Sequence, residues 1–151
     1  MAQALEILST ENELFRVYLF YGCILVLKVV AMAPLTAIQR FKHKAFANPE
    51  DAVVAKIKPK THENVERVRR AHLNDLENIP VFLVASLAYI LTNPSIWFTT
   101  MLFRIFTISR ILHTLVYAVV VIPQPARFLA FFAAQIVTTY MAIQSLIYFA
   151  K

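Results

Sequence analysis

Charged and polar side chains recur at spacings of three and four residues in three stretches of this sequence. Such spacing places side chains on one face of a helix. The three faces comprise Arg67, Arg70, Asn74 and Glu77; Arg110, His113 and Tyr117; and Arg127, Phe131 and Gln135. Arginines outnumber carboxylates in this set, and an excess of guanidinium groups predicts a site for an anionic ligand.

The composition indicates which elements position these faces. The chain of 151 residues is 59% hydrophobic and has a formal net charge of +6. That apolar fraction is typical of membrane proteins, so the basic charge does not indicate a nucleic-acid partner. A single glycine excludes a glycine-rich phosphate-binding loop, and a single cysteine excludes an internal disulfide and a cysteine-based zinc site. The sequence therefore predicts an all-α integral membrane protein with no metal site.

Four apolar segments predict a transmembrane four-helix bundle in a single domain, residues 1–151. The expected helices cover about 14–38, 64–91, 94–121 and 125–149. The second is apolar only over 79–91, and it reaches the length that a membrane requires only with the polar residues before it. Asn93-Pro94 predicts the start of the third helix, and the prolines at 123 and 125 predict a rigid turn before the fourth.

The basic residues predict the orientation. Nine of the 15 lysines and arginines lie between Arg40 and Arg70, so the loop over about 40–63 is expected to face the cytoplasm. In that orientation Glu77 lies roughly 21 Å from the non-cytoplasmic end of its helix, and Arg110 lies roughly 25 Å from the non-cytoplasmic end of its own helix. Both positions are inside a hydrocarbon core about 30 Å thick. The polar faces are therefore expected to meet at one depth near the cytoplasmic side.

Ionisable side chains at this depth need partners, because each costs about 2.5–3.5 kcal/mol to insert. One interpretation is mutual pairing, in which Glu77 pairs with Arg70 or Arg110 and only holds the bundle together. The other is a ligand site. Lys28 and Arg104 are expected to lie away from the shared faces, and neither is assigned a role.

These motifs resemble the family of membrane-associated proteins in eicosanoid and glutathione metabolism (MAPEG), most closely its microsomal glutathione transferase branch. The resemblance extends over nearly the whole chain after Leu14. It is carried by residues 45–51 (AFANPED), residues 65–78 (VERVRRAHLNDLEN), Arg110 with His113-Thr114 and Tyr117, and Pro123-Gln124-Pro125 with Arg127 and Phe131-Phe132.

The resemblance implies a four-helix subunit that assembles as a homotrimer and binds glutathione, its co-substrate, between neighbouring subunits near the cytoplasmic face. Arginines suit the two carboxylates of glutathione, and Glu77 suits its ammonium group. The residues that the resemblance places at glutathione are Arg40, Arg70, Asn74, Glu77, His113, Tyr117, Arg127 and Gln135. Arg110 belongs to the same helix face as His113 and Tyr117, and we expect it to bind glutathione with them.

Two residues are implied to be catalytic. Arg127 is expected to hold the glutathione sulfur as a thiolate, since a guanidinium never deprotonates, and a hundredfold gain in thiolate corresponds to roughly 2.7 kcal/mol. Asp51 is expected to orient Arg127, although residues 48–51 (NPED) also fit a plain helix start. The thiolate would attack a lipophilic electrophile arriving from the membrane lipid, or reduce a lipid hydroperoxide, in a detoxification role.

Two alternatives remain. One is a glutathione-dependent isomerase similar to the prostaglandin E synthases, which carry an arginine where this chain has Leu73 and a serine where it has Phe128. The other is a non-catalytic lipid-binding scaffold, which would not need Arg127, Glu77 and Arg70 together. The resemblance implies residence in the endoplasmic reticulum or, as an alternative, the outer mitochondrial membrane.

Overall fold

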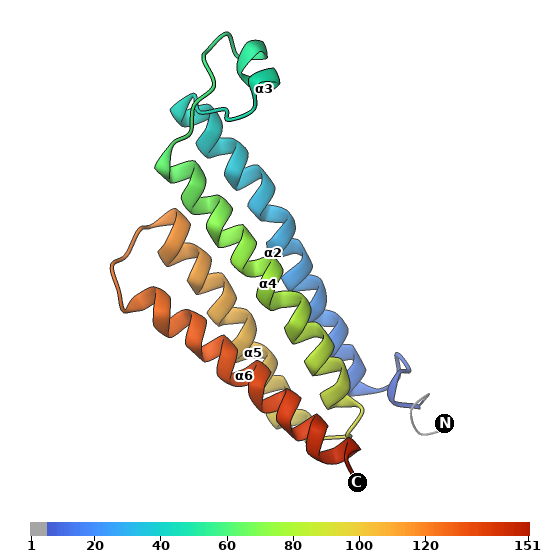
Figure 1. Cartoon of the computed structure of the whole chain (residues 1–151). Coiled ribbons are helices and arrows are strands. Elements are labelled where there is room, and N and C mark those ends of the chain that lie inside the picture. The colour runs from blue at the N-terminus through green and yellow to red at the C-terminus, as the bar shows by residue number, and fades with distance from the viewer. Residues whose placement is uncertain (1–5) are drawn as a thin grey trace.

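The computed structural model describes residues 6–151, and this part of the chain folds into helices without any β-strand. The predicted all-α class is confirmed. The elements are α2 (Glu13–His43), α3 (Pro49–Val54), α4 (Glu63–Ile90), α5 (Ile96–Thr114) with a π-helical turn at Leu115–Val119, and α6 (Ala126–Phe149). The long helices α2, α4, α5 and α6 run alongside one another, and α3 lies beyond one end of the bundle (Figure 1).

Helix α2 is longer at its C-terminal end than the expected range of 14–38. It begins after Asn12, whose side chain accepts hydrogen bonds from the first turn, and it continues through Pro34 to His43. It ends where Lys44 adopts a left-handed conformation with φ of 48°, and the Lys44 N–H bonds to the carbonyl of Arg40. The expected range was too short because apolarity marks the depth of the membrane, whereas a helix ends where its backbone is capped.

Helix α5 begins two residues later than the expected start at Asn93-Pro94. Asn93 has a φ of 52°, which is left-handed and differs from the extended conformation typical of an N-cap. Ser95 precedes the first helical residue, Ile96, instead. At its other end α5 changes into the π-helical turn, which ends at Val119 rather than at residue 121.

Aromatic rings fill the centre of the bundle where α4 meets its neighbours. Phe82 of α4 stacks on Phe106 of α5 with ring centroids 3.6 Å apart, and it meets Phe103 edge-on at 5.2 Å. Leu25 of α2 and Met141 of α6 belong to the same core and are fully buried. In lipid such a core stabilises the bundle through close packing rather than through the expulsion of water.

The buried face of α4 carries one carboxylate. Val68, Ala71, Asp75, Ile79 and Phe82 follow one another at spacings of three and four residues, and all five are buried. Asp75 is therefore directed into the bundle, between the apolar side chains that pack α4 against α2, α5 and α6.

Three of the helices are long and apolar enough to cross a membrane: α2, α6, and α5 together with its π-helical turn. Large apolar side chains cover their outer surfaces, for example Leu27 of α2 and Leu146 of α6, which are 68% and 71% exposed. Such surfaces suit a hydrocarbon environment. Helix α4 differs because its first half is charged, so its passage through the membrane stays a prediction.

Candidate functional site

Two pockets adjoin where α4, the π-helical turn and the start of α6 converge. Their volumes are about 190 and 340 Å³, and Asn74, His113 and Tyr117 line both of them. The first is also lined by Arg70, Leu73 and Glu77, and the second by Gln124, Arg127, Phe128 and Phe131. These paired pockets bring together polar residues from the three helix faces that the sequence analysis identified.

Tyr117 lies at the centre of this arrangement. It belongs to the π-helical turn, a geometry that is rare in proteins and frequent at functional sites. The guanidinium carbon of Arg127 lies 4.8 Å from the centre of the Tyr117 ring. On the α5 side, the ring of His113 stacks against Tyr117 with centroids 5.5 Å apart. The first turn of α6 and the last turns of α5 thus meet on one aromatic side chain.

Arg70 connects α4 to the same tyrosine. Its Nε donates a hydrogen bond to the Tyr117 hydroxyl over 3.2 Å, and its Nη2 donates to Oε1 of Glu63 over 2.6 Å. The Arg70 side chain is 48% exposed, so its ion pair with Glu63 is screened and contributes little to stability. The Arg70 guanidinium is held at the rim of the first pocket, where a ligand can reach it.

Two nitrogen atoms of the site are buried without a hydrogen-bond partner among the described residues: Nε of Arg127 and Nδ1 of His113. Buried polar atoms are almost always hydrogen-bonded in native proteins. Both residues line the second pocket, so these atoms are suited to polar groups of a ligand. Nε of Arg127 only donates, whereas Nδ1 of His113 donates or accepts according to the tautomer.

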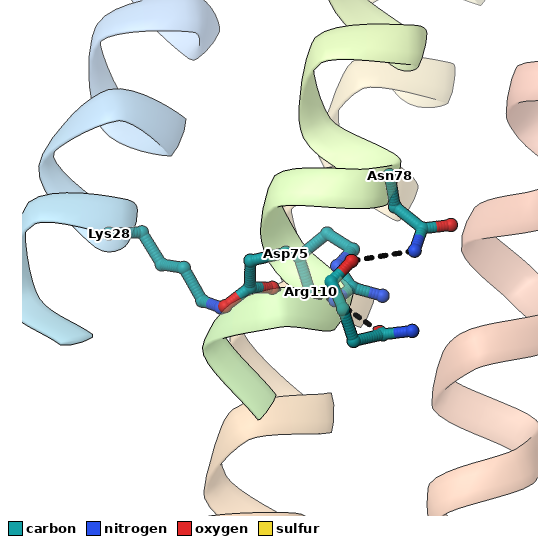
Figure 2. Close-up of polar contacts among 5 residues, drawn as sticks. Lys28, Asp75, Asn78 and Arg110 are labelled. Atoms are coloured by element: carbon teal, nitrogen blue, oxygen red, sulfur yellow. Dashed lines mark hydrogen bonds and ion pairs between the residues drawn. The ribbon is translucent and has the colours of Figure 1, made fainter. Parts of the chain in front are cut away.

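A buried cluster of charges adjoins Asn74, which lines both pockets. We call Lys28, Asp75 and Arg110 the charge cluster (Figure 2). Nη2 of Arg110 donates to Oδ1 of Asp75 over 2.6 Å and to Oδ1 of Asn74 over 2.8 Å. The ammonium of Lys28, from α2, contacts the other carboxylate oxygen of Asp75. The side chains of Arg110 and Asp75 are 0% exposed. Arg110 therefore lies within the bundle rather than in the pocket wall.

The ion pairs of the two arginines correct one interpretation of the sequence. Arg110 pairs with Asp75 and Arg70 pairs with Glu63, so the proposed pairing of either arginine with Glu77 was wrong. Lys28, which was expected to lie away from the shared faces, contacts Asp75, a carboxylate that belongs to none of them. No role was assigned to Asp75 from the sequence alone. Asp75 is the one carboxylate on the apolar face of α4, and its position between apolar residues spaced three and four apart could have revealed it.

Glu77 is exposed and lines the first pocket. Within residues 6–151 no ion pair engages its carboxylate, in contrast to Glu63 and Asp75 on the same helix. Its negative charge therefore remains available to a cationic group of a ligand.

Three predicted residues do not line the paired pockets within one chain. Arg40 is half-buried in the last turn of α2, and Gln135 is half-buried on α6, one turn beyond Phe131. Asp51 is exposed on α3, where its Oδ2 accepts a hydrogen bond from Nδ2 of Asn48 over 3.2 Å. In the described part of the chain, no hydrogen bond or ion pair joins Asp51 to Arg127.

Comparison with known proteins shows the family to which the chain belongs. The model of the MAPEG family matches residues 18–147, which include every pocket-lining residue described above. The chain belongs to the MAPEG family. Because that family consists of membrane proteins, α2, α5 and α6 are assigned as membrane-embedded helices, and the chain is an integral membrane protein.

Relatives within the MAPEG family indicate the branch. The chain is 46% identical over 142 residues to microsomal glutathione S-transferase 1 of Mus musculus, with 90% of this chain and 91% of the relative covered. It is 43% identical over 152 residues to the protein of the same name from Sus scrofa, with 97% and 96% covered. Similarity to prostaglandin E synthase of Equus caballus is lower, at 37% over 129 residues, with 84% of each chain covered.

Proposed function

We propose that this chain is a membrane-bound glutathione transferase that conjugates glutathione to lipophilic electrophiles and also reduces lipid hydroperoxides. The observation that carries the proposal is Arg127, whose guanidinium lies over Tyr117 at a 340 Å³ pocket and keeps a buried Nε without a partner among the described residues. The relatives named microsomal glutathione S-transferase 1, at 43% and 46% identity, support the same activity.

The charges around the paired pockets match those of glutathione. Glutathione carries two carboxylates, one ammonium group and a thiol. Arg70 at the rim of the first pocket binds a carboxylate, and Glu77 beside it binds the ammonium. Both charges are accessible, because the ion pair of Arg70 with Glu63 is exposed and Glu77 forms no ion pair among the described residues. This orientation directs the remaining part of the tripeptide, with its sulfur, toward the second pocket and Arg127.

Arg127 then activates the thiol. A permanent positive charge stabilises the thiolate in preference to the thiol, and the thiolate is the nucleophile. With an aryl halide, the sulfur forms a bond to the ring carbon and the halide departs with the bonding pair, while the thiol proton passes to water. With a hydroperoxide, the thiolate cleaves the O–O bond to give an alcohol and a sulfenic acid, and a second glutathione converts the latter to the disulfide and water.

The same proposal includes the assembly and location of the protein. All four long helices, α4 included, cross the membrane, and three subunits form a homotrimer with glutathione between neighbours. Arg40, Asp51 and Gln135 lie outside the paired pockets of one chain, which supports a role for them at the contact with a neighbouring subunit. We place the protein in the endoplasmic reticulum, with the outer mitochondrial membrane as the alternative.

A titration of the purified protein with glutathione in detergent tests the proposal. Thiolate absorbance and conjugation of a chlorinated nitrobenzene are measured together, and native mass spectrometry of the same sample gives the number of subunits. We expect saturable thiolate formation, conjugation and a mass of three chains. If the protein shows no binding of glutathione and no conjugation at millimolar glutathione, the enzyme proposal is overturned.

Two other functions predict different results in that titration. A prostaglandin-type isomerase would convert a prostaglandin endoperoxide much faster than it conjugates an aryl halide. Leu73 and Phe128 argue against it, because they line the paired pockets at the positions where those enzymes carry arginine and serine. A lipid-binding scaffold would bind lipid and show no thiolate signal.

A further inference from the structure

Asn74 connects the charge cluster to the paired pockets. Its side chain lines both pockets, and its Oδ1 accepts the hydrogen bond from Nη2 of Arg110 over 2.8 Å. A guanidinium group only donates hydrogen bonds, so the atom of Asn74 that faces Arg110 must be the carbonyl oxygen. The amide nitrogen, Nδ2, therefore faces away from Arg110, and no described residue accepts a hydrogen bond from it.

Asp75 determines where Arg110 lies. Arg110 is held through Nη2 alone, since its Nε and Nη1 are buried and have no hydrogen-bond partner among residues 6–151. The only carboxylate that it contacts in the described chain is that of Asp75, which is shared with Lys28. Without the Asp75 charge, two cations would face each other in a buried region, and nothing would keep Nη2 directed at Asn74.

We propose that Asp75 is a positioning residue that holds Arg110 so that the amide of Asn74 presents its N–H groups to the paired pockets, where they donate to an acceptor oxygen of glutathione. This inference rests on the proposed function. It also states which part of glutathione each residue binds. Asn74 binds a carboxylate or carbonyl oxygen, and Glu77, on the next turn of α4, binds the ammonium.

A double-mutant cycle of Asp75→Asn and Asn74→Ala tests the coupling in the full-length protein purified in detergent. Each single substitution is expected to raise the KM for glutathione about tenfold, with kcat changed less than about twofold, because one hydrogen bond to a charged group is lost. In the double variant, the second substitution is expected to raise the KM by less than about twofold beyond the effect of the first, since Asp75 acts through Asn74. The proposal would be overturned if the two KM effects multiply in the double variant, or if kcat falls by as large a factor as KM rises.

Two further variants keep the test decisive. Glu66→Gln is the matched control, because it removes a carboxylate of α4 that pairs with the exposed Arg69 outside the pockets, and its KM should equal that of the wild type. If Asp75→Asn does not fold, Asn74→Asp replaces it: the carboxylate still accepts from Arg110 but offers no N–H group. Its KM should rise at least about tenfold, and a wild-type KM would overturn the proposal.

The outcomes also separate this inference from the function on which it rests. If the wild-type protein does not bind glutathione, the proposed function fails. If it binds, but the KM values of Asp75→Asn and Asn74→Ala equal that of the wild type, the proposed function stands and the roles of Asp75 and Asn74 fail.

Discussion

The guanidinium of Arg127 lies over the ring of Tyr117, 4.8 Å from its centre, and this contact holds the arginine without neutralising it. An aromatic face attracts a cation through its quadrupole and takes no proton or charge from it. A carboxylate in the same place would cancel the field that an incoming thiolate needs. The pair therefore combines a fixed position with a full positive charge, which is the arrangement that thiol activation requires.

Replacement of Arg127 by alanine should lower the rate of aryl halide conjugation by about a hundredfold at saturating glutathione. The physical reason is that a hundredfold smaller thiolate fraction corresponds to roughly 2.7 kcal/mol of lost preferential stabilisation. Stopped-flow absorbance of the thiolate, measured alongside product formation, checks whether both fall together. Arg69→Ala, which removes an exposed arginine paired with Glu66, is the control and should keep both signals. A wild-type rate in Arg127→Ala would remove this residue from the mechanism.

Two substitutions of Tyr117 should separate its ring from its hydroxyl. Tyr117→Phe keeps the aromatic face under Arg127 and loses the acceptor for Nε of Arg70, so glutathione affinity should fall a few-fold while thiolate formation is retained. Tyr117→Leu loses the ring as well, so thiolate formation should also fall. Binding calorimetry and thiolate absorbance measure the two effects, and identical behaviour of both variants would contradict the division of roles.

Residue spacing alone was sufficient to predict much of the pocket wall. Arg70, Asn74 and Glu77 share a face because α4 is an uninterrupted helix, and a helix fixes which side chains are neighbours along it. Spacing within single helices also assigned Arg110 to the ligand face, whereas the structure buries it behind Asn74. The burial of Arg110 depends on how closely α5 packs against α4, and the residue pattern of a single helix gives no information about that packing.

The charge cluster shows a second limit of the same reasoning. Lys28, Asp75 and Arg110 come from three helices, and the sequence of any one helix does not show which of its charges pair with another helix. The membrane cost of a lone charge implies that each has a partner, but the partners are identified only by the register between helices. The π-helical turn that follows α5 at Tyr117 could likewise not be predicted, since no proline or glycine lies within it to mark a change of helix type.

The aromatic core makes a prediction about stability. Phe82→Ala should lower the free energy of unfolding by about 3 kcal/mol, because it leaves a cavity at a fully buried ring that stacks on Phe106. The neighbouring Val81→Ala is the control, since Val81 is 57% exposed and leaves no internal cavity. Thermal unfolding in one detergent, followed by circular dichroism, compares the two. Equal melting temperatures would contradict the central role of Phe82.

Glu77→Gln should weaken glutathione binding about tenfold and leave the rate at saturating glutathione nearly unchanged. The carboxylate is proposed to bind the ammonium of glutathione, and a charge-assisted hydrogen bond of this kind contributes about 1.5–3 kcal/mol. N-acetylated glutathione, which lacks the ammonium, provides the decisive comparison. The wild-type protein and Glu77→Gln should bind it equally, and a persistent difference would show that Glu77 acts on another part of the ligand.

Phe128 and Leu73 should determine which electrophiles are accepted. Phe128 is 53% exposed, stacks against Phe132 on α6 and lines the second pocket beside Arg127, so it offers an apolar surface to an aryl substrate. Phe128→Ser should therefore raise the KM for a chlorinated nitrobenzene several-fold, while Leu73→Ala, in the first pocket, should leave that KM unchanged. Steady-state kinetics with the electrophile varied at fixed glutathione distinguishes them. If Leu73→Ala has the larger effect, the electrophile enters through the first pocket, and the assignment of the two pockets to the two substrates must be reversed.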